Sequence, residues 1–108
     1  MMIYIVKEDK YLQVDVNLTE ANLNNANEFK TQIISLLDQK KKSIVLNLAQ
    51  VQYIDSSFLG AIVAALKHAI SMQLDVILVG LQPDIHNLVK LIRLDKVFKI
   101  YNDYSEVL

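Results

Sequence analysis

The alternation of apolar and polar residues near the start of the chain predicts a pair of strands. Residues 11–16 read Tyr-Leu-Gln-Val-Asp-Val, and such an alternation is typical of a half-buried strand. A shorter apolar run, Ile3–Val6, precedes it, and the charged residues 7–10 between the two runs predict a turn. We therefore expect an antiparallel hairpin at the N-terminus.

The next part of the chain changes to the period of a helix. Residues 17–25 are polar and rich in asparagine, which predicts a loop that offers helix caps. Apolar residues then recur at helical spacing, with charged residues on the other face, and they are Ala26, Phe29, Ile33, Leu36 and Leu37. This pattern predicts an amphipathic helix that ends in the lysine run 40–42.

Buried strands and helices alternate over the rest of the chain. Two strongly apolar runs, residues 43–48 and 75–79, predict strands of the buried kind. The remaining predicted elements are helices over residues 58–72 and 83–92, a short final strand over 97–100, and the start of a last helix over Tyr104–Leu108.

This order of elements predicts an α/β fold. We expect a central, mostly parallel mixed sheet of four to five strands, with an N-terminal β-hairpin and three to four helices packed on it. The length of 108 residues fits a single domain over residues 1–108.

Composition removes several classes of function. The chain has 11 basic and 12 acidic residues, and the run Lys40–Lys42 lies at a connection between elements, so we expect no direct binding of nucleic acid. No cysteine is present, which excludes disulfides and thiolate nucleophiles. The charged N-terminus does not fit a signal peptide, and the apolar stretch 58–66 is too short to span a membrane. We therefore expect a cytoplasmic protein that has no membrane partner.

The residues most able to carry chemistry are Asp55, Ser56 and Ser57, which lie between a buried strand and the helix that follows. Functional groups of open α/β sheets gather at the carboxyl ends of strands, close to helix N-termini. Short polar residues at such a position cap the helix, and capping alone is the commoner role. A serine there can also accept a phosphate, whose charge a helix N-terminus tolerates. The residue pattern by itself leaves both roles open.

Two longer stretches carry a resemblance to a known family. The strand Ile44–Leu48, followed by Val51-Gln52-Tyr53-Ile54-Asp55-Ser56-Ser57-Phe58-Leu59-Gly60, resembles the STAS signature, in which a strand of the VLNL type leads into V-x-[FY]-[ILM]-D-S-S-G-L-G. The run Leu94–Ile100 is similar to the ending LDKVF-x-I of that family. The resemblance covers nearly the whole chain and implies a STAS fold of the anti-sigma factor antagonist type.

The resemblance also implies a function as a partner switch. Proteins of this type bind an anti-sigma factor that is also a serine kinase, and this binding frees a sigma factor. The kinase phosphorylates the serine after the aspartate, which breaks the complex, and a PP2C-type phosphatase restores it. The serine that matches is Ser56, while Asp55 and Ser57 match residues that cap the helix or face the partner. The protein is then a substrate of this cycle and not an enzyme, and no cofactor is implied.

The sequence departs from the family pattern on both sides of this site. Phe58 replaces the first glycine of S-G-L-G, and we expect its side chain to be exposed as part of the partner surface. The segment Thr19–Asn22 stands where the family has G-x-[LF]-D, so that Asn22 replaces the acid in a loop that contacts the kinase. Asn22, Asp55, Ser57 and Phe58 are therefore the predicted partner-binding residues.

Two alternatives remain at this point. The first is a STAS binding module without a switch, such as a component of a lipid-transport or larger signalling complex, in which Ser56 only caps the helix. The second is a small enzyme, for which the sequence offers little. His68 and His86 fall on different predicted helices without a third ligand, and Ser56 lacks the G-x-S-x-G elbow of hydrolases. We expect no catalytic, metal-binding or cofactor-binding residues.

Overall fold

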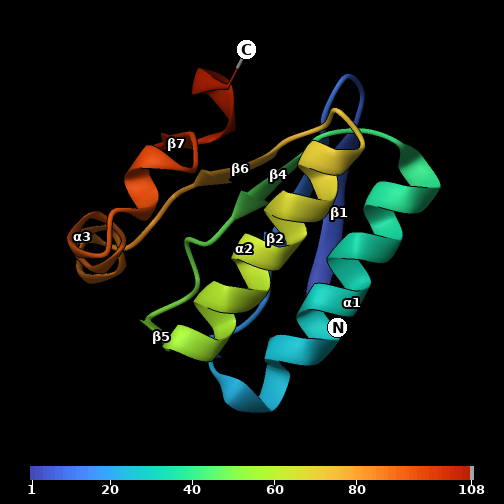
Figure 1. Ribbon diagram of the computed structural model, residues 1–108. Helices are drawn as coiled ribbons and strands as arrows, with labels where there is room; N and C mark the ends of the chain where they lie inside the picture. Colours follow the sequence, from blue (N-terminus) through green and yellow to red (C-terminus); the bar gives the residue numbers. More distant parts are fainter. Residues whose placement is uncertain (108) are drawn as a thin grey trace.

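The computed structural model describes residues 1–107, and a mixed five-stranded sheet lies at its centre (Figure 1). The strands lie in the order β1-β2-β4-β6-β7, and only β1 is antiparallel to its neighbour. They comprise β1 (Ile3–Glu8), β2 (Leu12–Val16), β4 (Ile44–Asn47), β6 (Val76–Val79) and β7 (Ile100–Tyr101). The predicted hairpin and the mostly parallel sheet are therefore confirmed, and so is the α/β fold class.

Three helices cover one face of this sheet. They are α1 (Leu23–Lys40), α2 (Ser56–Ser71) and α3 (Pro83–Leu91). Figure 1 shows α1 and α2 side by side, with α3 on the side of the molecule away from α1. The buried residues of β2, which alternate with half-buried ones, face the same core as the apolar residues of all three helices. Helices α1 and α2 meet at Phe29 and Phe58, whose ring centroids lie 4.5 Å apart.

The opposite face of the sheet is covered by the C-terminal segment of the described chain. Val45, Ile77 and Val79 are buried there beneath a second set of apolar residues, namely Tyr11, Tyr101, Tyr104 and Val107. The Tyr104 hydroxyl donates a hydrogen bond of 3.0 Å to Oδ1 of Asp15. Burial, and secondarily the Asp15 carboxylate, raise the pKa of Tyr104 well above its usual value.

Several predicted boundaries differ from those of the structure. Helix α1 begins at Leu23 and not at Ala26, because Asn22 already caps it. The last strand, β7, is formed by Ile100–Tyr101 and not by residues 97–100. Most of the predicted run instead forms a turn after the short 3₁₀ helix η1 (Leu94–Lys96). The predicted last helix is only a 3₁₀ turn, η2 (Tyr104–Glu106), and Leu108 lies outside the described residues.

A second sheet of two very short strands was not predicted. The strands β3 (Glu20–Ala21) and β5 (Tyr53–Ile54) pair in parallel. The first lies within the predicted loop 17–25, and the second lies between the predicted strand 43–48 and the predicted helix 58–72. Neither strand is long enough to show a period in the sequence. Over residues 1–107, no helix combines the length and the hydropathy that a membrane crossing requires.

Candidate partner-binding site at the start of helix α2

The two-stranded sheet brings the starts of α1 and α2 together. Strand β3 leads directly into α1, and β5 leads directly into α2. Glu20 pairs with Tyr53 and Ala21 with Ile54, and the Asp55 amide donates a hydrogen bond of 3.0 Å to the Ala21 carbonyl. Figure 1 shows both helix starts at the same end of the molecule as a result. Two helix N-termini, each carrying a partial positive charge, therefore lie next to each other.

The Asp55 carboxylate connects the two helices. Its Oδ1 accepts a hydrogen bond of 2.9 Å from the Phe58 amide, which is the N-cap bond of α2. Its Oδ2 accepts a second bond of 2.9 Å from the amide of Leu23, the first residue of α1. One side chain thus satisfies unpaired N–H groups of both helices. The predicted role of Asp55 as a cap is confirmed, and its bond to α1 is an addition that the sequence did not indicate.

Asn22 caps the neighbouring helix α1. Its side-chain oxygen accepts a hydrogen bond of 2.9 Å from the Asn24 amide, and the Asn25 side chain accepts one of 2.9 Å from the Asn22 amide in return. This reciprocal pair is a capping box, which the asparagine-rich loop contains as Asn-x-x-Asn. Asn22 thus holds the start of α1 in place with a neutral side chain, where the family pattern has an acid.

Ser56 and Ser57 form the first turn of α2, and both are exposed. Neither α1 nor α2 has an acidic residue in its first turn. The carboxylate that contacts both helix starts is that of Asp55. A hydroxyl at position 56 is accessible to another protein, and an anion placed on it would lie beside the N-terminus of α2.

The expectation for Phe58 is wrong. The side chain of Phe58 is 0% exposed and packs against Phe29 of α1. The spacing of the apolar residues on α2 indicates that Phe58 is buried, because it lies on the same face of the helix as the buried residues Ile62 and Leu66. Phe58 therefore fixes α2 onto α1 from the inside, and it offers no side-chain surface to a partner.

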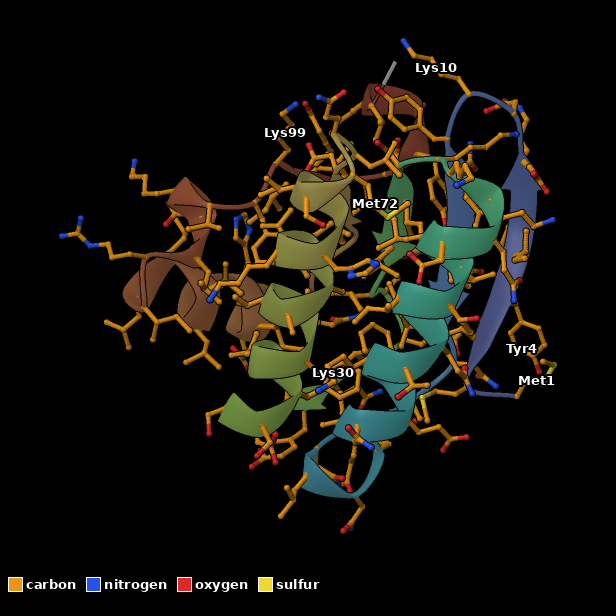
Figure 2. The ribbon with its side chains drawn as sticks, turned by 45° about the vertical axis from the view of Figure 1, so that its right-hand side comes forward. Met1, Tyr4, Lys10, Lys30, Met72 and Lys99 are labelled. Atoms are coloured by element: carbon orange, nitrogen blue, oxygen red, sulfur yellow. The ribbon has the colours of Figure 1, made fainter. Side chains whose placement is uncertain are left out.

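Two exposed apolar residues that the sequence pattern did not single out lie at the starts of these helices. Leu23 is 71% exposed at the start of α1, and Tyr53 is 55% exposed on β5. A groove of about 360 Å³ runs from Leu23 and Ser57 along the two helices toward Lys30 and Gly60. Figure 2 shows the Lys30 side chain between α1 and α2. A Cβ atom added at Gly60 would meet nothing within 4 Å, so this part of the groove is open to solvent.

The two histidines do not form a reactive group with these residues. Nε2 of His68 lies 2.7 Å from Oδ1 of Asp38, and this contact joins the far ends of α1 and α2. His86 lies on α3. Within residues 1–107, no cluster of three or more histidine, cysteine or acidic side chains is arranged to hold a metal ion.

Comparisons with known proteins agree on one family. The family model of the STAS domain matches residues 13–107. A protein of Thermotoga neapolitana, provisionally assigned as an anti-sigma factor antagonist, is 34% identical over 90 residues, which are 82% of this chain and 80% of that protein.

Solved structures give the same picture. The crystal structure of a protein with the same provisional assignment, from Thermotoga maritima, has 33% identity and a TM-score of 0.76, covering 87% of this chain and 82% of that one. The unphosphorylated form of the anti-sigma factor antagonist SpoIIAA, which is 14% identical, shares the fold with a TM-score of 0.70 over 96% of this chain and 88% of that one. A phosphorylated form of SpoIIAA from Bacillus shares it with a TM-score of 0.71 over 96% and 92%.

Proposed function

The chain belongs to the STAS domain family, and from this premise we propose that it is an anti-sigma factor antagonist whose partner binding is switched off by phosphorylation of Ser56. The observation that carries the proposal is the exposed Ser56 residue in the first turn of α2, directly after Asp55, whose carboxylate accepts hydrogen bonds from the starts of both helices. In this proposal the protein is a single cytoplasmic domain over residues 1–108, and it acts as a binding partner and a substrate and not as an enzyme.

The unmodified protein binds an anti-sigma factor that is also a serine kinase. The surface that serves this contact consists of Ser56 and Ser57 together with the exposed side chains of Leu23 and Tyr53. An exposed tyrosine is typical of protein interfaces, and exposed apolar side chains mark a surface that can bind another protein. Asn22 and Asp55 take part by holding the two helix starts in register, because both use their side-chain oxygens as caps.

Phosphorylation changes the charge of this surface. A phosphoserine at position 56 adds a charge of about −1.5 to −2 where the unmodified protein presents a neutral hydroxyl. An interface formed around the hydroxyl then has to desolvate an unpaired dianion, and a mismatch of about 3 kcal/mol lowers affinity about 100-fold. A PP2C-type phosphatase restores the binding form by removing the phosphate.

The experiment is intact-mass spectrometry after incubation with ATP and the anti-sigma factor kinase encoded nearest to this gene. We expect a gain of one phosphate that is absent in Ser56→Ala. Ser57→Ala is the matched control, because Ser57 is the other exposed serine of the same helix turn, and it should still gain the phosphate. Calorimetric titration with the kinase domain should then show binding of the unmodified protein and at least about 100-fold weaker binding of the phosphorylated one.

The opposite result is equally informative. If the kinase modifies another substrate but leaves this protein unmodified, Ser56 is only part of the helix start and the switch is refuted. The chain would then be a STAS binding module without a switch, as in a transport or larger signalling complex. A phosphate that persists in Ser56→Ala and disappears in Ser57→Ala would show that the kinase modifies Ser57 and not Ser56.

A further inference from the structure

The end of helix α3 carries a surface that the proposed function does not use. Lys90, Leu91, Ile92 and Arg93 are four consecutive exposed residues, and Lys96 and Val97 are exposed shortly after them. We refer to these six residues as the basic tip. Lys90 and Leu91 end α3, Ile92 is its C-cap and Arg93 has a left-handed backbone conformation, so the exposed run follows the chain around the C-terminal end of the helix. In Figure 1, α3 lies apart from the pair α1 and α2.

The basic tip concentrates positive charge. Residues 90–99 contain four of the 11 basic residues of the chain and one of its 12 acidic residues, so this segment carries +3 although the whole chain carries −1. Lys90, Arg93 and Lys96 form no ion pair with another residue in the range 1–107, whereas Lys99 lies 3.4 Å from the Asp75 carboxylate. The one acid, Asp95, has a carboxylate oxygen that is buried. The charge that reaches the surface is therefore mostly positive.

The basic tip also exposes large aliphatic side chains among these cations. Leu91 is 79% exposed, Val97 54% and Ile92 45%. Exposure of three aliphatic side chains to water at one place is energetically unfavourable, and such a cluster indicates contact with another surface. Cations mixed with aliphatic residues fit a surface that has anionic groups outside and hydrocarbon beneath them.

We propose that the basic tip binds the surface of an anionic lipid membrane, with Leu91 entering the interface and Lys90, Arg93 and Lys96 contacting lipid phosphates. Its shape favours a membrane over a protein segment. Peptide segments dock into grooves or onto strand edges, and the grooves between α1 and α2 and between β1 and α1 do not involve the basic tip. An exposed helix end, together with the exposed turn that follows it, instead suits a deformable surface. This inference does not depend on Ser56 or on an anti-sigma factor.

The expected strength follows from the exposed groups. Each lysine or arginine near an anionic membrane strengthens association about fivefold, so three such residues give a preference of about 100-fold over a neutral membrane. Insertion of a leucine side chain adds about tenfold or more. The interaction is then reversible and sensitive to salt, because ionic screening shortens the reach of the charges.

The test is co-sedimentation of the full chain with vesicles of phosphatidylcholine containing about one third phosphatidylglycerol, at low salt, against vesicles of phosphatidylcholine alone. We expect binding to the anionic vesicles, at least about 20-fold weaker binding for the double variant Arg93→Glu/Lys96→Glu, and about tenfold weaker binding for Leu91→Ser. The matched control is Lys10→Glu/Lys67→Glu, which changes the net charge equally at exposed sites outside the basic tip and should bind as the unchanged protein does. Circular dichroism of each variant confirms that it is folded.

Two results would overturn the proposal. Binding that falls equally in both double variants would reflect net charge and not the basic tip. Absence of binding to anionic vesicles by the folded protein would exclude a membrane. If the amide resonances of residues 90–97 shifted with poly-glutamate and not with the vesicles, the basic tip would belong to an acidic protein segment instead.

Discussion

Replacement of Asp55 by alanine is the most direct test of how the site is held together. The change removes both acceptors of a carboxylate that caps α2 through the Phe58 amide and also binds the Leu23 amide of α1, each at 2.9 Å. A helix cap of this kind contributes about 1 kcal/mol, so Asp55→Ala should lower the free energy of unfolding by about 2 kcal/mol. For a domain of this size that corresponds to a fall of about 8 °C in the melting temperature.

Two further variants that each lose a single hydrogen bond allow the loss of unfolding free energy in Asp55→Ala to be compared. Asn22→Ala removes a single cap, the bond to the Asn24 amide, and should cost about 1 kcal/mol. Asp55→Asn keeps one acceptor oxygen and loses the other, because an amide NH₂ group cannot accept a bond, and should also cost about 1 kcal/mol. The order of stability is therefore predicted as unchanged protein, then the two single-bond variants together, then Asp55→Ala.

Urea unfolding monitored by circular dichroism measures these differences. The comparison requires that the dependence of the unfolding free energy on urea concentration be the same for all variants. A loss for Asp55→Ala no greater than that for Asn22→Ala would refute the reasoning, since it would mean that one of the two carboxylate bonds contributes nothing. A loss above about 4 kcal/mol would refute it in the other direction and would show that Asp55 stabilises more than two helix ends.

Three further changes test other parts of the structure. Phe58→Ala should cost about 3–5 kcal/mol because it opens a cavity against Phe29, and thermal melting should show it more destabilised than any cap variant. Tyr104→Phe should cost about 1 kcal/mol near neutral pH through loss of the bond to Asp15. Because the pKa of Tyr104 is raised on folding, its contribution is complete below about pH 10 and declines above it, so the phenylalanine variant should lose less stability than the unchanged protein in urea titrations at alkaline pH. Gly60→Ala should raise the melting temperature, because alanine favours a helix by about 1 kcal/mol over glycine and its Cβ meets nothing within 4 Å.

The parts of the fold that could be predicted are those in which burial repeats with a period. The alternation over residues 11–16 places Leu12, Val14 and Val16 on the buried face of β2, as expected. The apolar runs of β4 and β6 are buried along nearly their whole length, which is typical of strands covered on both faces. The position of Asp55 before α2 followed from the transition between such a strand and the helical pattern.

The features that escaped prediction depend on contacts between distant segments. Strands β3 and β5 have two residues each, and they exist because the loops before α1 and α2 meet in space. The bond from the Leu23 amide to Asp55 follows from the same meeting, which no local pattern records. Phe58 was assigned to the surface by its place next to the serines, although its spacing relative to Ile62 and Leu66 indicated the core.

These contacts bear on how a phosphate at Ser56 would act. Rearrangement of the loop would have to release the two hydrogen bonds of Asp55, which costs about 2 kcal/mol. It would also have to draw Phe58 out of the core, which costs about 3–5 kcal/mol more because a cavity is left. The interaction of a charge with a helix N-terminus is smaller than this sum, at about 0.3–1 kcal/mol near the surface, and it favours the phosphate where it is. The scaffold therefore resists rearrangement, and a phosphate at Ser56 would act through the charge that it presents at the surface. In the proposed switch, phosphorylation would abolish partner binding without changing the fold, and the two states would differ at one exposed side chain.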